Sequence, residues 1–156
     1  MPRTPDPTKV VVAADVLVAD VFIDGPARIA MDRICSHSWF DLVASDPLLD
    51  DARTVLTQLG DETLADDWYT LIEPLCKIVD HPSRDHPALG SAYAAEAGHL
   101  LTYDKALTGA QTGIAMRRAM PISIRTPEAF VKTVTMEALY EANVGDRYPG
   151  PDQERS

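Results

Sequence analysis

The sequence is poor in cysteine, aromatic residues and lysine, and it has no long apolar run. Its two cysteines, Cys35 and Cys76, are too few for a disulfide framework, so we expect both to be reduced and buried. Aromatic residues make up only 6% of the 156 residues, so the core must consist mainly of Ala, Val, Leu and Ile. The most apolar stretch, VVVAADVLVADVFI, contains Asp15 and Asp20, and no run of about 18 uncharged apolar residues could cross a membrane. We therefore predict a cytoplasmic protein with one core and no membrane partner.

Motifs for several kinds of site are also absent. Neither a GxxxxGK[ST] loop nor a GxGxxG stretch is present, which disfavours a backbone cradle for nucleotide phosphates. There is no HExxH or paired CxxC motif, so zinc is not expected. His81, His86 and His99 lack ligand spacing, and we expect each of them in a loop or in the core.

Negative charge is what the sequence has in excess. The net charge is −10, Asp outnumbers Glu by 17 to 7, and Arg outnumbers Lys by 10 to 4. Short, strongly hydrated carboxylates suit a surface that stays soluble at very high salt, and we interpret the protein as halophilic. A moderately acidic protein of an ordinary cytosol is the alternative. Acidity usually argues against nucleic-acid partners, but at 1 M salt the Debye length is only about 3 Å, so net charge does not decide whether RNA is a partner.

Apolar runs and turn residues alternate along the chain, which predicts strands separated by helices. Strands are expected at 9–14, 40–44, 76–79, 99–102 and 122–126, and helices at about 15–24, 27–38, 45–60, 61–75, 85–98, 104–120 and from 126 onward. This order predicts an α/β fold, a single three-layer domain with a mainly parallel sheet of about five strands flanked by helices. We predict a flexible leader at 1–8, the domain at 9–135, a helical extension at 136–147 and a disordered tail at 148–156.

Several aspartates are expected at one edge of this sheet. They are Asp15 after the first strand, Asp46, Asp50 and Asp51 in the helix after the second strand, Asp85 before the fourth strand and Asp104 after it. Parallel α/β sheets bind ligands outside the carboxyl ends of their strands. Grouped carboxylates repel one another unless a cation lies between them, and Mg²⁺ or Mn²⁺ prefers oxygen ligands. The pattern therefore predicts a divalent-cation site suited to attack on a phosphodiester.

Each aspartate also has a simpler explanation. Aspartate is among the best helix N-caps, which accounts for Asp46, Asp85 and Asp104 one at a time. In a chain with 17 aspartates, chance clustering is a further explanation. For Asp104, which follows the buried run Leu100–Leu101 after only two residues, we expect both roles: it caps the next helix and faces a metal-binding rim of the sheet.

The order and spacing resemble the PIN domain, a family of metal-dependent ribonucleases that includes toxins of toxin–antitoxin pairs. The family pattern is a strand ending in D-x-N-x-L, a Ser-led helix with an early acid, an Asp-led helix of small residues, and a strand running into T-x-D. The corresponding stretches are VVVAADVL (10–17), ASDPLLDDA (44–52) and RDHPALGSAYAAEAGHLLTYDKAL (84–107). The resemblance covers about residues 9–126.

The resemblance implies a PIN-like sheet and an endoribonuclease that hydrolyses RNA phosphodiesters through a water activated by Mg²⁺ or Mn²⁺, leaving 5′-phosphate and 3′-hydroxyl ends. The acids with an implied catalytic role are Asp15, Asp51, Asp85 and Asp104. Of these, Asp15, Asp85 and Asp104 are also implied as metal ligands, and Thr102 is implied to support the site through its hydroxyl. An RNA substrate, an antitoxin-like partner and a homodimer are further expectations. Lys105 is expected to contact phosphate or to lie exposed.

Two departures from the family pattern lead to an alternative. The leading acid of the first strand falls on Ala13 and the Asn on Asp15, while the helical acid, usually Glu, is Asp51. The alternative is a catalytically degenerate PIN-like fold that binds RNA or a protein partner. A third hypothesis, a phospho-acceptor receiver that holds Mg²⁺, is disfavoured. Receivers have paired acids after strand one and Lys after strand five, where this chain has Arg125-Thr126.

Overall fold

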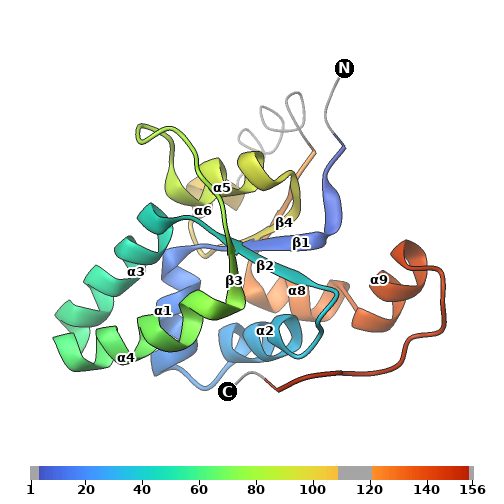
Figure 1. The fold of residues 1–156 in the computed structure, drawn as a ribbon, viewed down its shortest axis with the longest axis horizontal. Helices are drawn as coiled ribbons and strands as arrows, with labels where there is room; N and C mark the ends of the chain where they lie inside the picture. Colours follow the sequence, from blue (N-terminus) through green and yellow to red (C-terminus); the bar gives the residue numbers. More distant parts are fainter. Residues whose placement is uncertain (1–3, 109–120, 155–156) are drawn as a thin grey trace.

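Five parallel strands form one sheet at the centre of the protein, in the order β3-β2-β1-β4-β5 (Figure 1). The computed structural model describes residues 4–108 and 121–154. The strands are β1 (Asp6–Val12), β2 (Asp41–Ala44), β3 (Cys76–Ile78), β4 (Ala97–Leu101) and β5 (Ser123–Arg125). The predicted α/β class and the parallel sheet flanked by helices are therefore confirmed.

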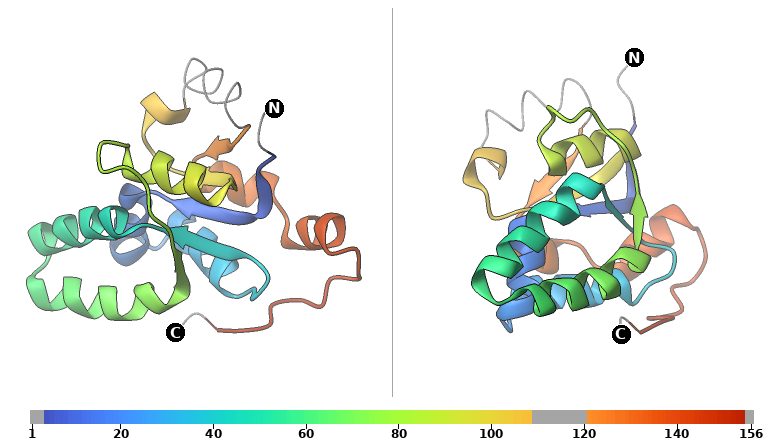
Figure 2. Two further views of the ribbon diagram at one scale, coloured as in Figure 1. Left: turned by 45° about the horizontal axis from the view of Figure 1, so that its top comes forward. Right: turned by 60° about the vertical axis from the view of Figure 1, so that its left-hand side comes forward.

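Helices cover both faces of this sheet and extend past one end of it. They are α1 (Ala14–Phe22), α2 (Pro26–Cys35), α3 (Asp46–Leu59), α4 (Glu62–Ile72), α5 (Pro87–Ala95), α6 (Lys105–Thr108), α8 (Pro127–Thr133) and α9 (Met136–Asn143), with a 3₁₀ turn at Glu73–Leu75. Helix α5 packs over β1, β2 and β4, while α2 and α8 pack together on the opposite face (Figure 1). Helices α3 and α4 lie side by side as a hairpin beyond the strand ends (Figure 2).

The central strand β1 determines where the core lies. Its residues Val10, Val11 and Val12 are almost fully buried, as expected for a strand covered on both faces. Val10 pairs with Leu42 of β2, and Val11 pairs with Leu100 of β4. The helix starts follow from local chemistry, since the side chains of Ser45, Asp61, Thr126 and Thr135 each accept a hydrogen bond from a backbone N–H of the following turn.

The first strand begins earlier than the sequence suggested. β1 starts at Asp6, inside the leader expected at 1–8, because the Asp6 N–H donates to the Glu96 carbonyl at 2.6 Å. Helix α5 ends at Ala95 and not at Gly98, since Glu96 takes the left-handed conformation (φ 54°) that closes the helix. Ala97 and Gly98 thereby belong to β4.

The segment expected as a disordered tail lies against the end of α2. The backbone N–H groups of Asp152 and Gln153 donate to the Ser36 carbonyl, and the Gln153 side chain donates to the Cys35 carbonyl. The carboxylate of Asp152 accepts hydrogen bonds from the N–H and the hydroxyl of Ser38, which lower the pKa of Asp152. Residues 148–154 thus satisfy carbonyl groups that a helix C-terminus leaves without intrahelical partners.

Two further expectations concern the helix at 104–120 and membrane-spanning helices. The helix expected at 104–120 begins as α6, and residues 109–120 lie outside the described part of the chain. No helix within residues 4–108 or 121–154 is long and apolar enough to cross a membrane.

Gly98 allows β4 to approach the start of β1, and we predict that Gly98→Ala destabilises the protein. A Cβ at this position would lie 2.7 Å from the Asp6 carbonyl oxygen and 2.8 Å from the Pro7 Cα, so backbone would have to move. We expect a loss of about 2–3 kcal/mol in the free energy of unfolding, near the top of the range for overpacking. Denaturant unfolding measures it. Gly25→Ala, whose Cβ would meet nothing closer than 3.7 Å, is the control; equal losses in both variants would contradict the prediction.

His99 gives a second prediction, about acid stability. Burial and then the charge of Arg125 lower the pKa of His99 from 6.5 to about 4, although its bond to the Pro7 carbonyl acts in the opposite direction. The unfolded chain takes up a proton near pH 6.5 that the folded chain refuses until about pH 4, so His99 makes the protein lose stability as pH falls through this window. In His99→Gln, which keeps a side-chain N–H donor, this part of the loss should disappear.

The measurement is the denaturant midpoint at pH 7 and pH 4.5 at constant high salt. His86→Gln, which replaces an exposed histidine, is the matched control. If the wild type and His99→Gln lose the same stability on acidification, the buried neutral imidazole is not the cause.

Candidate functional site

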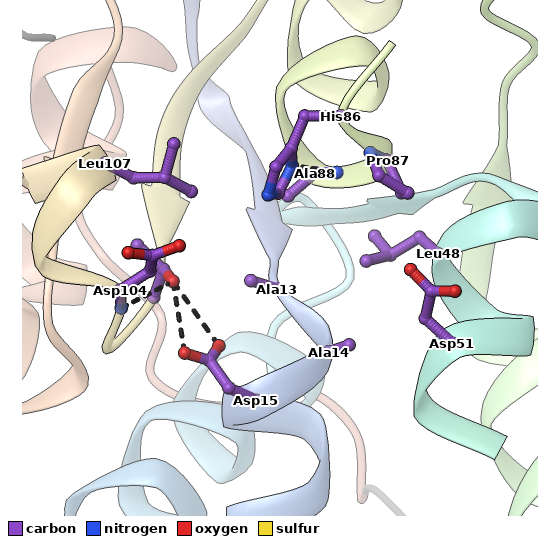
Figure 3. Close-up of a pocket in the computed structure, with 11 residues that line it drawn as sticks. Ala13, Ala14, Asp15, Leu48, Asp51, His86, Pro87, Ala88, Asp104 and Leu107 are labelled. Carbon is purple, nitrogen blue, oxygen red and sulfur yellow. Dashed lines mark hydrogen bonds between the residues drawn. The ribbon is translucent and has the colours of Figure 1, made fainter. Parts of the chain in front are cut away.

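A cavity of about 210 Å³ lies at the carboxyl ends of β1 and β4 (Figure 3). The starts of α1, α3, α5 and α6 surround it, as expected for the ligand edge of a parallel sheet. Its lining residues are Ala13, Ala14, Asp15, Leu48, Asp51, His86, Pro87, Ala88, Thr102, Asp104 and Leu107. Four of the five site residues predicted from the sequence therefore share one cavity.

Asp15 is held in place by hydrogen bonds from the protein. Its carboxylate accepts from the Val16 N–H at 2.8 Å, the Tyr103 N–H at 2.9 Å and the Thr102 hydroxyl at 3.2 Å. Because Asp15 lies in the first turn of α1 and Thr102 directly follows β4, these bonds join the ends of two neighbouring strands (Figure 3). Both carboxylate oxygens of Asp15 are thus engaged by donors of the chain itself.

Asp104 caps a helix, as expected, and it also lines the cavity at the strand exit. Its Oδ1 accepts a hydrogen bond from the Ala106 N–H at 2.9 Å, which caps the start of α6, and its side chain lines the cavity. Its own N–H donates to the Thr102 hydroxyl oxygen at 3.0 Å. Thr102, only 1% exposed, therefore connects Asp15 with the backbone of Asp104. Lys105 is exposed and does not line the cavity.

Asp51 approaches from the other side of the cavity, on α3 (Figure 3). Its carboxylate accepts no hydrogen bond from the part of the chain that the structure describes, and it is exposed. The neighbouring Asp50 does not line the cavity, because successive helical residues point in different directions. Asp51 is therefore the acid that is freest to receive a ligand.

The structure places Asp85 outside the lining and His86 within it. Pro87 occupies the first turn of α5, so the extended residue before it, His86, becomes the N-cap, and its Nδ1 accepts from the Ala88 N–H at 3.2 Å. Asp85 packs instead towards Gly90, where an added Cβ would lie 3.1 Å from the Asp85 Cβ. The His86 imidazole therefore caps α5 at the edge of the cavity.

The cavity is consequently anionic and lacks a compensating side chain. Three carboxylates line it, and none of its lining residues in the described chain is Lys or Arg. Burial, and then the negative charges of Glu128 and Asp15, raise the pKa of the neighbouring Tyr103. Such a cavity attracts a cation, either a metal ion or an organic one.

A fixed metal centre does not fit the donor set as it stands. A divalent ion needs ligand oxygens that converge on one point, but both Asp15 oxygens bond to protein donors and one Asp104 oxygen caps α6. Asp51 lies on the opposite wall (Figure 3). Within residues 4–108 and 121–154, no three His, Cys, Asp or Glu side chains are grouped closely enough to hold a metal.

Comparison with known proteins yields a family but no annotated relative. The sequence matches, over residues 4–156, the family described as a family of unknown function, DUF7384. The chain belongs to this family. No curated protein and no solved structure matches this DUF7384 chain.

Sequence reasoning missed His86 and the apolar walls of the cavity. Leu48, Ala88 and Leu107 come from three helices and carry no chemical motif, so only their position reveals them. For His86 a signal was present: a residue that directly precedes Pro at a helix start is the expected N-cap, which assigns the cap to His86 and not to Asp85.

The bonds of Asp15 predict a structural role that can be measured apart from any ligand. Asp15→Ala removes three hydrogen bonds to a charged acceptor on a partly exposed side chain, and we expect a loss of about 1–2 kcal/mol in the free energy of unfolding. Asp51→Ala removes an acid with no such bonds and should change stability by about 0.5 kcal/mol or less. Denaturant unfolding compares the two; equal losses would show that Asp15 does not join the strand ends.

Proposed function

We propose that this DUF7384 protein is a catalytically degenerate PIN-like fold whose cavity binds a cationic side chain of a protein partner. The observation that carries the proposal is the uncompensated charge of the cavity, where Asp15, Asp51 and Asp104 face a space lined by no described Lys or Arg. Ala13 at the position of the leading acid, and Asp85 outside the lining, also favour binding over hydrolysis.

The dimensions and walls suit an arginine or lysine side chain. A cavity of about 210 Å³ has room for a guanidinium or ammonium group with part of its stem. The stem would pack on Leu48, Ala88 and Leu107, as long charged side chains do on apolar surfaces. The head would then reach the carboxylates of Asp51 and Asp104, with which a guanidinium can form charge-assisted hydrogen bonds.

The same charges disfavour a phosphodiester in this cavity when no metal is present. A phosphate placed among three carboxylates is repelled at contact distance, where salt screens little. A cationic group gains from the same field, and it displaces water from carboxylates that line the same cavity.

The second candidate is the metal-dependent endoribonuclease that the PIN resemblance implies. Acids from three elements, α1, α3 and the segment after β4, share one cavity at the carboxyl edge of the sheet, which favours this candidate. It would require Mg²⁺ or Mn²⁺ to draw Asp51 and Asp104 away from their present arrangement. This nuclease function stays a prediction.

A pair of matched peptides tests the proposal. We would titrate ¹⁵N-labelled protein in high salt with acetyl-Gly-Arg-Gly-amide and with its citrulline counterpart, which has the same shape without the charge. The arginine peptide should bind with a Kd on the order of 1 mM, about 4 kcal/mol, and shift cavity resonances, whereas the citrulline peptide should not. Asp51→Asn and Asp104→Asn should each weaken binding roughly three- to tenfold.

Controls separate the two candidates. Asp50→Asn lies next to Asp51 but off the cavity and should leave peptide binding unchanged. Calorimetry with Mn²⁺, followed by an RNA cleavage assay, tests the nuclease. Micromolar Mn²⁺ binding that disappears in Asp51→Asn and Asp104→Asn, together with RNA cleavage, would overturn the proposal in favour of the ribonuclease.

A further inference from the structure

The imidazole of His86 is the one nitrogen-bearing side chain among the described residues that line the cavity. In Figure 3 its ring extends from the start of α5 into the cavity. The residue is also exposed, so the ring lies at the mouth. The only other side-chain donor of the lining is the hydroxyl of Thr102, which is buried and donates to Asp15 at 3.2 Å. His86 is therefore the side chain through which the lining can offer a hydrogen to a ligand.

The cap of α5 determines which ring nitrogen of His86 can offer that hydrogen. Nδ1 accepts a hydrogen bond from the Ala88 N–H at 3.2 Å. A neutral imidazole carries one hydrogen, which then lies on Nε2, and an imidazolium carries one there as well. Nε2 is thus a donor whatever the charge of the ring. Within residues 4–108 and 121–154, Ala88 is the only residue that forms a hydrogen bond with the His86 side chain, so the Nε2–H is left for water or a ligand.

The same hydrogen makes His86 a poor metal ligand. A histidine binds a metal through a nitrogen that has no hydrogen. Nε2 could do so only if its hydrogen moved to Nδ1, and Nδ1 would then no longer accept the Ala88 N–H that caps α5. His86 therefore suits a hydrogen bond to a ligand oxygen better than coordination of a cation.

Helix α5, which has His86 at its start, is fixed against α3. The hydroxyl of Ser91 on α5 donates to the Oγ of Ser45, the N-cap of α3, at 2.9 Å. The Nε2 of His81 lies 2.8 Å from the same Ser45 oxygen, and these three side chains form the Ser45–His81–Ser91 chain. Both serines are fully buried. His86 and the acid on α3, Asp51, therefore face the cavity from two walls whose separation is set by the fold.

The lining thus offers two different kinds of group to a ligand. The carboxylates of Asp51 and Asp104 attract a cation, and the Nε2–H of His86 requires an acceptor such as a carbonyl oxygen. A metal ion or a polyamine has no acceptor to place there. An arginine or lysine within a peptide has one, because its main chain carries carbonyl groups on both sides of the side chain. That main chain has to stay at the mouth, where His86 lies, when the side chain enters the cavity.

We propose that His86 is a specificity-determining residue, whose Nε2–H donates to a main-chain carbonyl of the partner and selects a cation within a peptide over a free cation. This proposal rests on the proposed function and names its ligand class, an arginine or lysine with a carbonyl acceptor beside it. One hydrogen bond of this kind changes an affinity roughly three- to tenfold.

Two probes that differ in the main chain test the proposal. Acetyl-Gly-Arg-Gly-amide carries the guanidinium and the carbonyl groups, and propylguanidinium is the arginine side chain alone. We would titrate both into ¹⁵N-labelled wild type and into His86→Ser, which keeps an oxygen to cap α5, in high salt and at one pH. In His86→Ser the peptide should bind roughly three- to tenfold more weakly, whereas the affinity for propylguanidinium should change less than about twofold.

A second replacement removes the donor and keeps the ring. Nε2-methylhistidine at position 86 retains the Nδ1 that caps α5 but lacks the Nε2–H, and it should weaken peptide binding as His86→Ser does. The matched control is Ser83→Ala, in the same loop but outside the lining, which should leave both affinities unchanged. In the wild type, the ¹⁵N resonance of the His86 Nε2 should move when the peptide is added and move much less with propylguanidinium.

The outcomes separate this role of His86 from the proposed function. Equal weakening of both probes would show that His86 only shapes the cavity, and unchanged peptide binding would show that it makes no bond to the main chain. Either result overturns the proposal while the proposed function stands. A wild-type protein that binds neither probe would overturn the proposed function and, with it, this role of His86.

Discussion

The parallel pairing of β1 with β4 is the constraint on which the rest of the structure depends. Val12 pairs with Leu101, and the Ala13 N–H then donates to the Leu101 carbonyl at 2.9 Å, so both strands end at the same level. Asp15 and Thr102 leave their strands side by side, and the carboxylate of Asp15 can reach the Thr102 hydroxyl and the Tyr103 N–H. The cavity is a consequence of that register, because a slip of one residue would turn each of these side chains to the other face.

The fold could be predicted from the sequence because its local signals agree with one another. The buried run of β1, the Ser45 and Thr126 caps followed by Pro, and the small residues of α5 all indicate the same alternation of strands and helices. What could not be predicted depends on distant contacts. The early start of β1 needs the Glu96 carbonyl, and the position of segment 148–154 needs the Cys35 and Ser36 carbonyls at the end of α2, neither of which is visible in a local pattern.

The part of the site that lies at the ends of strands could be predicted from the sequence. Asp15 and Asp104 were found because each follows a core strand, and Asp51 because it matches the early acid of the Ser-led helix in the PIN pattern. Asp85 and His86 are neighbours, and either could cap helix α5. His86 is the cap because of the conformation that Pro87 imposes on the residue before it. The Ser45–His81–Ser91 chain could not be foreseen, since its three members are ordinary polar residues in segments 36 and 46 residues apart from Ser45.

Ala13 and Asp15 are linked through the charge of the cavity. An acid at position 13 would lie against the strand end beside Asp15 and Asp104, and their mutual repulsion would require a cation. Ala13 is buried, 5% exposed, and contributes neither charge nor a cap to α1. Without an acid there, Asp15 can accept three hydrogen bonds from the chain and join the strand ends by itself. The carboxylate of Asp15 is thus held by the fold, and Asp51 and Asp104, which accept fewer hydrogen bonds from the chain, are the acids that we propose for an incoming cationic group.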